Sequence, residues 1–140
     1  MINIRGNCVC GAVEIIIREY GDFVYTCHCD NCRRQNSGPV LSVDPGPKEN
    51  IEFIRGEDII TIYHDEEIER GFCSICGTNL FWHSPEKNHY CMNAELFDSI
   101  IKNASFNLEL FYDAKPEYYA FAGERKKLNS NFEEIIEDCQ

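Results

Sequence analysis

The 140-residue sequence has no long apolar stretch and no leader-like N-terminus. No apolar run approaches the roughly 18 residues that a membrane-spanning helix needs. A secretory signal would place an apolar segment after a basic start, whereas residues 1–6 lead straight into a cysteine motif. We therefore expect a cytoplasmic protein with no membrane partner. In that compartment thiols stay reduced, so an odd number of cysteines, nine, needs no pairing.

Basic residues are few, and their scarcity weighs against a nucleic-acid role. The sequence has 13 Lys and Arg against 24 Asp and Glu, for a formal net charge of −11 at pH 7. An acidic protein repels a phosphate backbone at long range. The basic clusters are Arg33-Arg34 and Arg125-Lys126-Lys127, and we interpret the second as a solvated surface stretch. We expect no nucleic-acid partner.

Helical patterns are scarce, internal repeats and linkers are absent, and strand patterns dominate. Val13, Ile15 and Ile17 alternate with their neighbours, which is typical of a half-buried strand over residues 12–18. Short helices are expected only at residues 96–102 and 131–138, the second from the capping-box spacing of Ser130 and Glu133. The sequence predicts one mainly β, mostly antiparallel domain. Its other strands are expected at residues 23–26, 51–55, 59–64, 67–72, 78–83, 89–94 and 108–112, with a turn at 44–47.

Seven of the nine cysteines stand in three clusters. These are Cys8-Val9-Cys10-Gly11, Cys27-His28-Cys29-Asp30-Asn31-Cys32 and Cys73-Ser74-Ile75-Cys76-Gly77. Two thiols one or two residues apart can both point at one ion, whereas disulfide partners need Cα atoms about 5.5 Å apart with facing Cβ vectors. The spacing therefore predicts metal sites. The other two cysteines, Cys91 and Cys139, belong to no motif.

The first and third clusters are interpreted as two halves of one structural zinc site. A glycine follows each pair directly, and glycine permits the positive φ with which a chain turns back tightly at a metal. A site with four thiolates is closed and tetrahedral, and its metal contributes directly to folding free energy. Its ligands would be Cys8, Cys10, Cys73 and Cys76.

The middle cluster offers three thiols, Cys27, Cys29 and Cys32, and no evident fourth ligand. A zinc ion held by three protein ligands keeps an open position, which is typical of a reactive site. The alternative is a fourth ligand from elsewhere, such as His28, Cys91 or a distant histidine. The open position would accept a thiolate or polarise a carbonyl oxygen.

Three residues near this cluster have two interpretations each. His28 lies between two ligands and in an extended segment would point away from the metal, which suits either a packing or second-shell role or a catalytic one. Arg33 and Arg34 could balance the thiolates or face solvent, and they could equally hold a substrate carboxylate.

Taken together, the three cysteine motifs resemble those of a known family. Residues 6–13, 27–34 and 72–82 are similar, in order and spacing, to the glutathione-dependent formaldehyde-activating enzyme family, which includes centromere protein V. The resemblance implies a β-tent (Mss4-like) zinc-binding fold with few short helices over residues 1–125. Residues 126–140 would be an acidic C-terminal extension, interpreted as a short helix.

The resemblance also implies an activity, two zinc ions and their ligands. It assigns a structural zinc to Cys8, Cys10, Cys73 and Cys76, and a catalytic-type zinc to Cys27, Cys29 and Cys32. The expected function is a carbon–sulfur lyase-type reaction on an adduct of glutathione, or another small thiol, with formaldehyde or a related aldehyde. Arg33 or Arg34 would bind the thiol's carboxylate. The alternative is a zinc-built binding or regulatory scaffold without turnover, and the sequence does not predict an oligomeric state.

Overall fold

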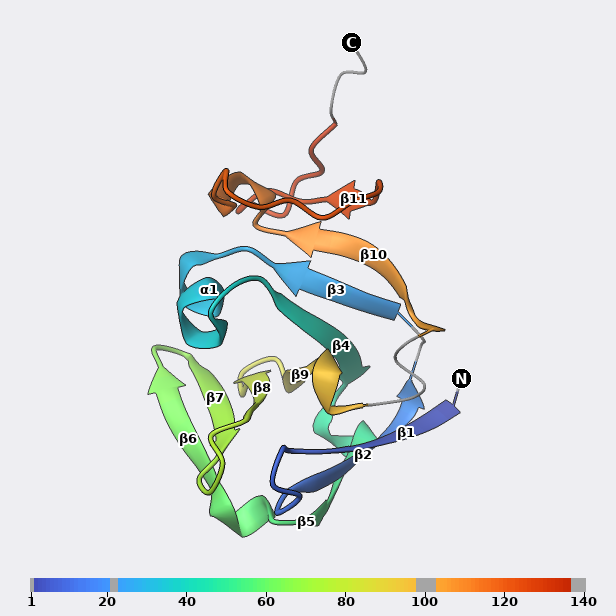
Figure 1. Cartoon of the computed structure of the whole chain (residues 1–140), viewed down its shortest axis with the longest axis vertical. Helices are drawn as coiled ribbons and strands as arrows, with labels where there is room; N and C mark the ends of the chain where they lie inside the picture. Colours follow the sequence, from blue (N-terminus) through green and yellow to red (C-terminus); the bar gives the residue numbers. More distant parts are fainter. Residues whose placement is uncertain (1, 21–22, 98–102, 137–140) are drawn as a thin grey trace. The chain divides into compact units, whose positions relative to one another are not determined.

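The computed structural model describes residues 2–20, 23–97 and 103–136 of the chain. These residues belong to two compact units. The first unit lies within Met1–Asp22 and Ser42–Ala104, and the second within Phe23–Leu41 and Ser105–Gln140 (Figure 1). Strand β4 (Val40–Gly46) begins in the second unit and continues into the first.

The first unit is built from antiparallel strands. One sheet has the order β1-β2-β5, and a second series of strands pairs in the order β4-β9-β8-β7-β6. The turn between β1 and β2 carries Cys8 and Cys10. Cys73 is the last residue of β7, and Cys76 lies in the turn between β7 and β8. The bounds are β1 Ile2–Asn7, β2 Glu14–Tyr20, β5 Ile51–Arg55, β6 Ile60–Asp65, β7 Ile68–Cys73, β8 Asn79–Ser84 and β9 His89–Asn93.

The core of the first unit follows the predicted alternation. Ile15 and Ile17 of β2 are fully buried, as is Val13 just before the strand, because β2 is the central strand of its sheet and packs one face inward. Leu80 and Met92 are fully buried as well. Short 3₁₀ helices connect strands at Lys48–Asn50, Glu57–Ile59 and Ala94–Leu96.

The second unit contains β3 (Phe23–Cys27), helix α1 (Asp30–Asn36), β10 (Ser105–Leu110) and β11 (Lys126–Lys127). Strand β10 pairs in parallel with both β3 and β11, whereas the strand pairs described for the first unit are antiparallel. A 3₁₀ helix at Tyr112–Ala114 follows β10. The buried side chains of this unit include polar ones, namely Thr26, His28, Glu109 and Lys127.

The mainly β class is confirmed, and so are the predicted strands, with shifted ends. Strands β1, β4 and β11 and helix α1 were not predicted, and Asp44–Gly46 ends β4 instead of forming a separate turn. The helix expected at 131–138 is wrong for its described part: residues 131–136 contain no helix, and Glu134 instead forms a β-bridge with Leu128. Most of the helix expected at 96–102 lies outside the described residues. Within the described ranges, no helix has the length and apolar character required to cross a membrane.

Candidate metal centres

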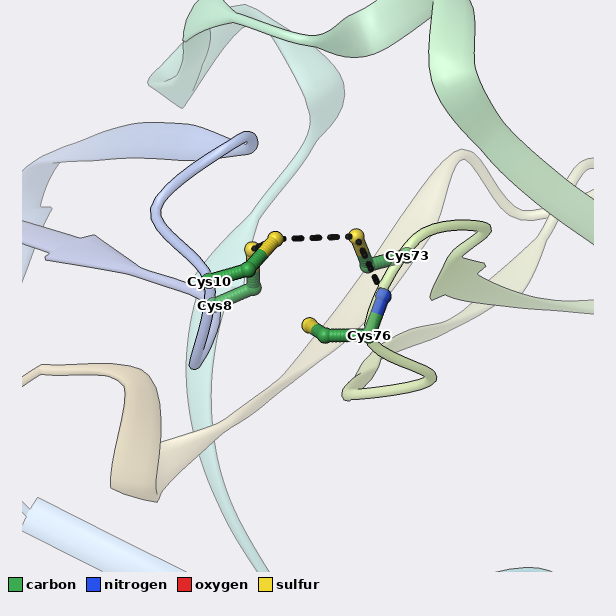
Figure 2. Close-up of side chains that lie close together, drawn as sticks. All are labelled: Cys8, Cys10, Cys73 and Cys76. Atoms are coloured by element: carbon green, nitrogen blue, oxygen red, sulfur yellow. Dashed lines mark hydrogen bonds between the residues drawn. The ribbon is translucent and has the colours of Figure 1, made fainter.

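Four cysteines from two turns of the first unit converge on one point. Their sulfur atoms all lie within 4.8 Å of one another, and Figure 2 shows the four side chains pointing together. The Cys8 and Cys10 sulfurs are 3.6 Å apart, and those of Cys10 and Cys73 are 3.8 Å apart although 63 positions separate the two residues. Cys8 and Cys73 are buried, whereas Cys10 and Cys76 are exposed.

The two turns have similar backbone geometry, which explains the glycine after each cysteine pair. Gly11 and Gly77 both have φ of +79°, a left-handed conformation that glycine adopts without steric cost. The N–H of Gly11 donates to the Cys8 carbonyl at 3.0 Å, and the N–H of Gly77 donates to the Cys73 carbonyl at 2.8 Å. Each turn also directs a backbone N–H at a sulfur, from Val13 to Cys8 at 3.3 Å and from Cys76 to Cys73 at 3.5 Å.

The pKa values of the thiols in this cluster are shifted in different directions. The Thr78 hydroxyl and N–H lower the pKa of Cys76 to about 5. Burial raises the pKa of Cys8, but the Val13 N–H and neighbouring thiols outweigh burial, and the net shift is downward. The Ala12 N–H lowers the pKa of Cys10, yet burial and the other three thiols raise it to about 11. Without a cation the cluster therefore keeps protons that a bound cation would displace.

The geometry of this cluster fits a tetrahedral metal ion. Zinc–sulfur bonds of about 2.3 Å place the sulfurs of a tetrahedral site about 3.8 Å apart. The sulfur separations of 3.6 and 3.8 Å match that value. The four cysteines could therefore hold a metal ion, and their all-sulfur donor set is consistent with zinc.

The second cluster lies entirely in the second unit. Cys27 is the last residue of β3, Cys29 is the N-cap of α1, and Cys32 is buried in the first turn of that helix. The Cys32 N–H donates to the Cys29 sulfur at 3.4 Å, so forming the helix brings these two thiols together. The three sulfur atoms lie within 4.8 Å of one another.

This cluster also requires a cation to ionise fully. Hydrogen bonds with the Cys29 and Cys32 thiols raise the pKa of Cys27 above its ordinary value, and burial raises it further. Three thiols at this separation could hold a metal ion, again with a donor set consistent with zinc. Among the described residues, no fourth His, Cys, Asp or Glu joins the group.

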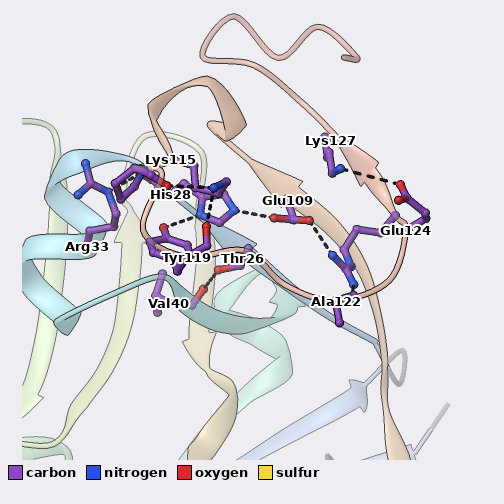
Figure 3. A network of polar contacts seen from close by, with 12 residues as sticks. Thr26, His28, Arg33, Val40, Glu109, Lys115, Tyr119, Ala122, Glu124 and Lys127 are labelled. Carbon is purple, nitrogen blue, oxygen red and sulfur yellow. Dashed lines mark hydrogen bonds and ion pairs between the residues drawn. The ribbon is translucent and has the colours of Figure 1, made fainter. Parts of the chain in front are cut away.

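His28 does not join the thiol group and takes part in a series of polar contacts. Its Nε2 lies 2.7 Å from Glu109 Oε1 and its Nδ1 lies 2.7 Å from the Tyr119 hydroxyl (Figure 3). Burial lowers the pKa of His28, although the Glu109 carboxylate opposes that shift. The neutral ring therefore donates its Nε2–H to Glu109 and accepts a hydrogen bond from the Tyr119 hydroxyl at Nδ1. With both ring nitrogens engaged, His28 is not the fourth ligand.

The two arginines of α1 differ in how they are held. The Nε of Arg33 donates to the His28 carbonyl at 2.8 Å, and its guanidinium also pairs with Asp30. Arg33 therefore helps to hold the loop that carries Cys27 and Cys29. Arg34 is exposed on the same helix. A role for either arginine in binding a carboxylate stays a prediction.

The sequence analysis assigned no role to Glu109, Tyr119 or Arg125. Arg125 Nη1 pairs with Glu109 Oε2 at 2.7 Å, which completes the contacts of that carboxylate. Glu109 alternates with apolar residues in β10 and therefore reads as a solvent-facing position, yet it is 2% exposed. No local signal in the sequence could identify it, because its partners are His28, which follows β3, and Arg125, which follows β10.

Three comparisons relate the chain to known proteins. The family model described as "Glutathione-dependent formaldehyde-activating enzyme" matches residues 3–114. A Schizosaccharomyces pombe protein described as an uncharacterized lyase is 34% identical over 121 residues, covering 84% of this chain and 85% of that protein. A crystal structure of a Rhodobacter sphaeroides protein has a TM-score of 0.58 and 21% identity, covering 74% of this chain and all of that one, which indicates a shared fold.

The family match includes both cysteine clusters and runs from within β1 to beyond the end of β10, and the S. pombe relative spans most of both chains. The motif resemblance noted in the sequence is thus confirmed over the greater part of its length. The chain belongs to the glutathione-dependent formaldehyde-activating enzyme family.

Proposed function

We propose that this protein is a zinc-dependent carbon–sulfur lyase-type enzyme that acts on the adduct of glutathione, or a related small thiol, with formaldehyde or a related aldehyde. Family membership and the lyase description of the fission yeast relative support a lyase-like, glutathione-related activity. The observation that carries the finer proposal is the cluster of three thiols without a fourth ligand among the described residues. We also expect the protein to work in the reducing cytoplasm, where these thiols remain available.

In this proposal the two clusters have different functions. Cys8, Cys10, Cys73 and Cys76 would hold a structural zinc, and Cys27, Cys29 and Cys32 would hold the reactive one. A zinc ion at the second cluster would supply Lewis-acid character to an incoming sulfur or oxygen atom. The reaction forms a carbon–sulfur bond from the thiol and the carbonyl carbon, and the thiol proton is transferred to the carbonyl oxygen.

The protein's own contribution would be to orient the reactants. Holding two reactants in the correct geometry removes much of the entropic barrier of a bimolecular step. Arg34 is exposed on α1, the helix that also carries Cys32, so its guanidinium would hold a glutathione carboxylate. His28 would not act as a general base, because both of its ring nitrogens already have partners.

The direct test is the rate of exchange between free formaldehyde and its glutathione adduct, measured by NMR with and without the protein. Because the reaction proceeds unaided, only acceleration above the background counts. Cys32→Ser should abolish the acceleration, while Cys91→Ser, which changes a cysteine outside both clusters, should retain it. No acceleration by the unmodified protein, or equal acceleration by Cys32→Ser, would refute the proposed activity.

The arginine assignment has its own test. Replacing Arg34 with Gln removes a charged hydrogen-bond donor to the carboxylate, so KM for glutathione should rise roughly tenfold while kcat changes little. The comparison substrate is a small thiol without a carboxylate, for which the variant and the unmodified protein should behave alike. An unchanged KM for glutathione would remove Arg34 from the binding site.

A further inference from the structure

Four polar side chains of the second unit, with His28 and Glu109 buried at the centre, form a continuous series of contacts next to the Cys27, Cys29 and Cys32 cluster. It runs from Tyr119 through His28 and Glu109 to Arg125, and each of the three contacts measures 2.7 Å. His28 is 0% exposed, Glu109 is 2% exposed and the Arg125 side chain is 7% exposed. A carboxylate so far from water is tolerated only when its charge is paired and its oxygens are hydrogen-bonded.

Every polar atom of His28 has a hydrogen-bond partner. The backbone N–H of His28 donates to the Leu110 carbonyl at 3.0 Å, and its carbonyl accepts from Arg33 Nε at 2.8 Å. The ring nitrogens contact Glu109 and Tyr119, and the Tyr119 ring stacks on the imidazole with centroids 5.5 Å apart. The peptide and the ring of His28 are therefore held against rotation.

The position of His28 in the sequence transmits this constraint to the thiols. His28 lies directly between Cys27 and Cys29, and its ring nitrogens contact Glu109 and Tyr119 instead of joining the three thiols. A rotation of the His28 peptide would change the direction of both cysteine side chains. Outer contacts that orient metal ligands typically change metal affinity by 10- to 100-fold when they are removed.

We propose that Glu109 and Tyr119 are positioning residues that hold the Cys27 and Cys29 thiols in metal-binding geometry by fixing His28 between them. Arg125 pairs with the Glu109 carboxylate and fixes its orientation. The inference rests on the proposed metal at the second cluster, but it does not depend on which reaction that metal serves. Its effect is confined to the second cluster, because Cys8, Cys10, Cys73 and Cys76 belong to the other unit.

Cobalt(II) substitution of the full-length protein tests this inference, because thiolate-bound cobalt has visible absorption that reports ligand geometry. The variant is Glu109→Gln, which keeps the shape of the side chain and removes its charge. We expect cobalt affinity at the second cluster to fall on the order of 10- to 100-fold, with an altered spectrum, while the first cluster is unchanged. The matched control is Glu124→Gln, which changes an 89% exposed carboxylate of the same unit.

Tyr119→Phe is the second variant, and it tests the positioning role of the His28 contacts if Glu109→Gln does not fold. It removes the hydroxyl contact to Nδ1 and keeps the ring that stacks on His28. A weaker, spectrally altered second site is expected here too. A folded variant whose thermal stability falls, but whose second site keeps its cobalt affinity and spectrum, would show a merely structural role and overturn the inference.

The result can be separated from a failure of the proposed function. A protein that binds cobalt at both clusters and does not accelerate formaldehyde exchange would refute the lyase proposal, and the affinity comparison would still decide the role of Glu109 and Tyr119.

Discussion

Arg125 is the cation at the end of the buried polar chain. Its guanidinium pairs with Glu109 and lies 4.1 Å from the centroid of the Phe106 ring, while its side chain is only 7% exposed. Removing one partner of a buried ion pair leaves an uncompensated charge away from water.

Arg125→Leu should therefore lower the free energy of unfolding by about 3–5 kcal/mol, measured by equilibrium urea denaturation. The control is Arg5→Leu, which removes a 2.8 Å ion pair to Glu14 whose arginine is 62% exposed and solvent-screened. That control should change stability far less. If both variants lost the same free energy of unfolding, the buried Arg125–Glu109 pair would not stabilise the protein more than an exposed one.

The seven clustered cysteines show which residues a sequence can identify. Each cluster is local, so the spacing of its thiols and the glycines after two of them are visible without a structure. The proximity of Cys10 to Cys73 links residues that are far apart in sequence. Only the matching pattern of the two cysteine pairs predicted that they share one site. Glu109 could not be found, because its burial depends on residues after β10 that cover it.

Strands β7 and β8 pack closely because β7 contains a glycine. A Cβ built on Gly71 would lie 2.4 Å from Cζ of Phe81, its cross-strand partner in β8. The Phe81 ring is itself packed against Tyr90, with centroids 5.2 Å apart, which limits how far it can move.

Gly71→Ala should therefore destabilise the protein by about 1–3 kcal/mol through overpacking, measured as a shift of the unfolding midpoint. Phe81→Leu in the Gly71→Ala background should recover part of the loss, because the smaller side chain gives the new methyl group room. If the two substitutions were instead additive in their destabilisation, the close contact would not be the cause.

The elements that the sequence missed are those with weak local patterns. Helix α1 has seven residues, and it is fixed by the Cys29 cap and by the αL residue Ser37 at its end instead of by an apolar stripe. At the other end of the chain, the Asn129 side chain accepts hydrogen bonds from the N–H groups of Asn131 and Glu133. This turn folds residues 131–136 back toward Lys127, so the capping-box spacing of Ser130 and Glu133 did not start a helix.

At the scale of the whole molecule, each candidate metal site draws all its ligands from one compact unit. The first site joins two turns that are distant in sequence, whereas the second lies within six consecutive residues. Loss of a metal that closes a long stretch of chain should reduce folding stability more than loss of one held locally.

Cys32→Ser should therefore bind one zinc equivalent instead of two and remain folded, as measured by elemental analysis and circular dichroism. Cys73→Ser should also lose one equivalent, with a larger fall in Tm. Loss of both metals from either variant would contradict the division into two separate sites.

The proposed function depends on a metal at the three-thiol cluster that keeps an open position for a thiol substrate. The most direct measurement is the visible spectrum of the cobalt-substituted second site during titration with glutathione, with S-methylglutathione as the control that lacks a free thiol. We expect a saturable spectral change with glutathione, none with the methylated control and none in Cys32→Ser. A four-coordinate spectrum that glutathione does not alter would contradict it.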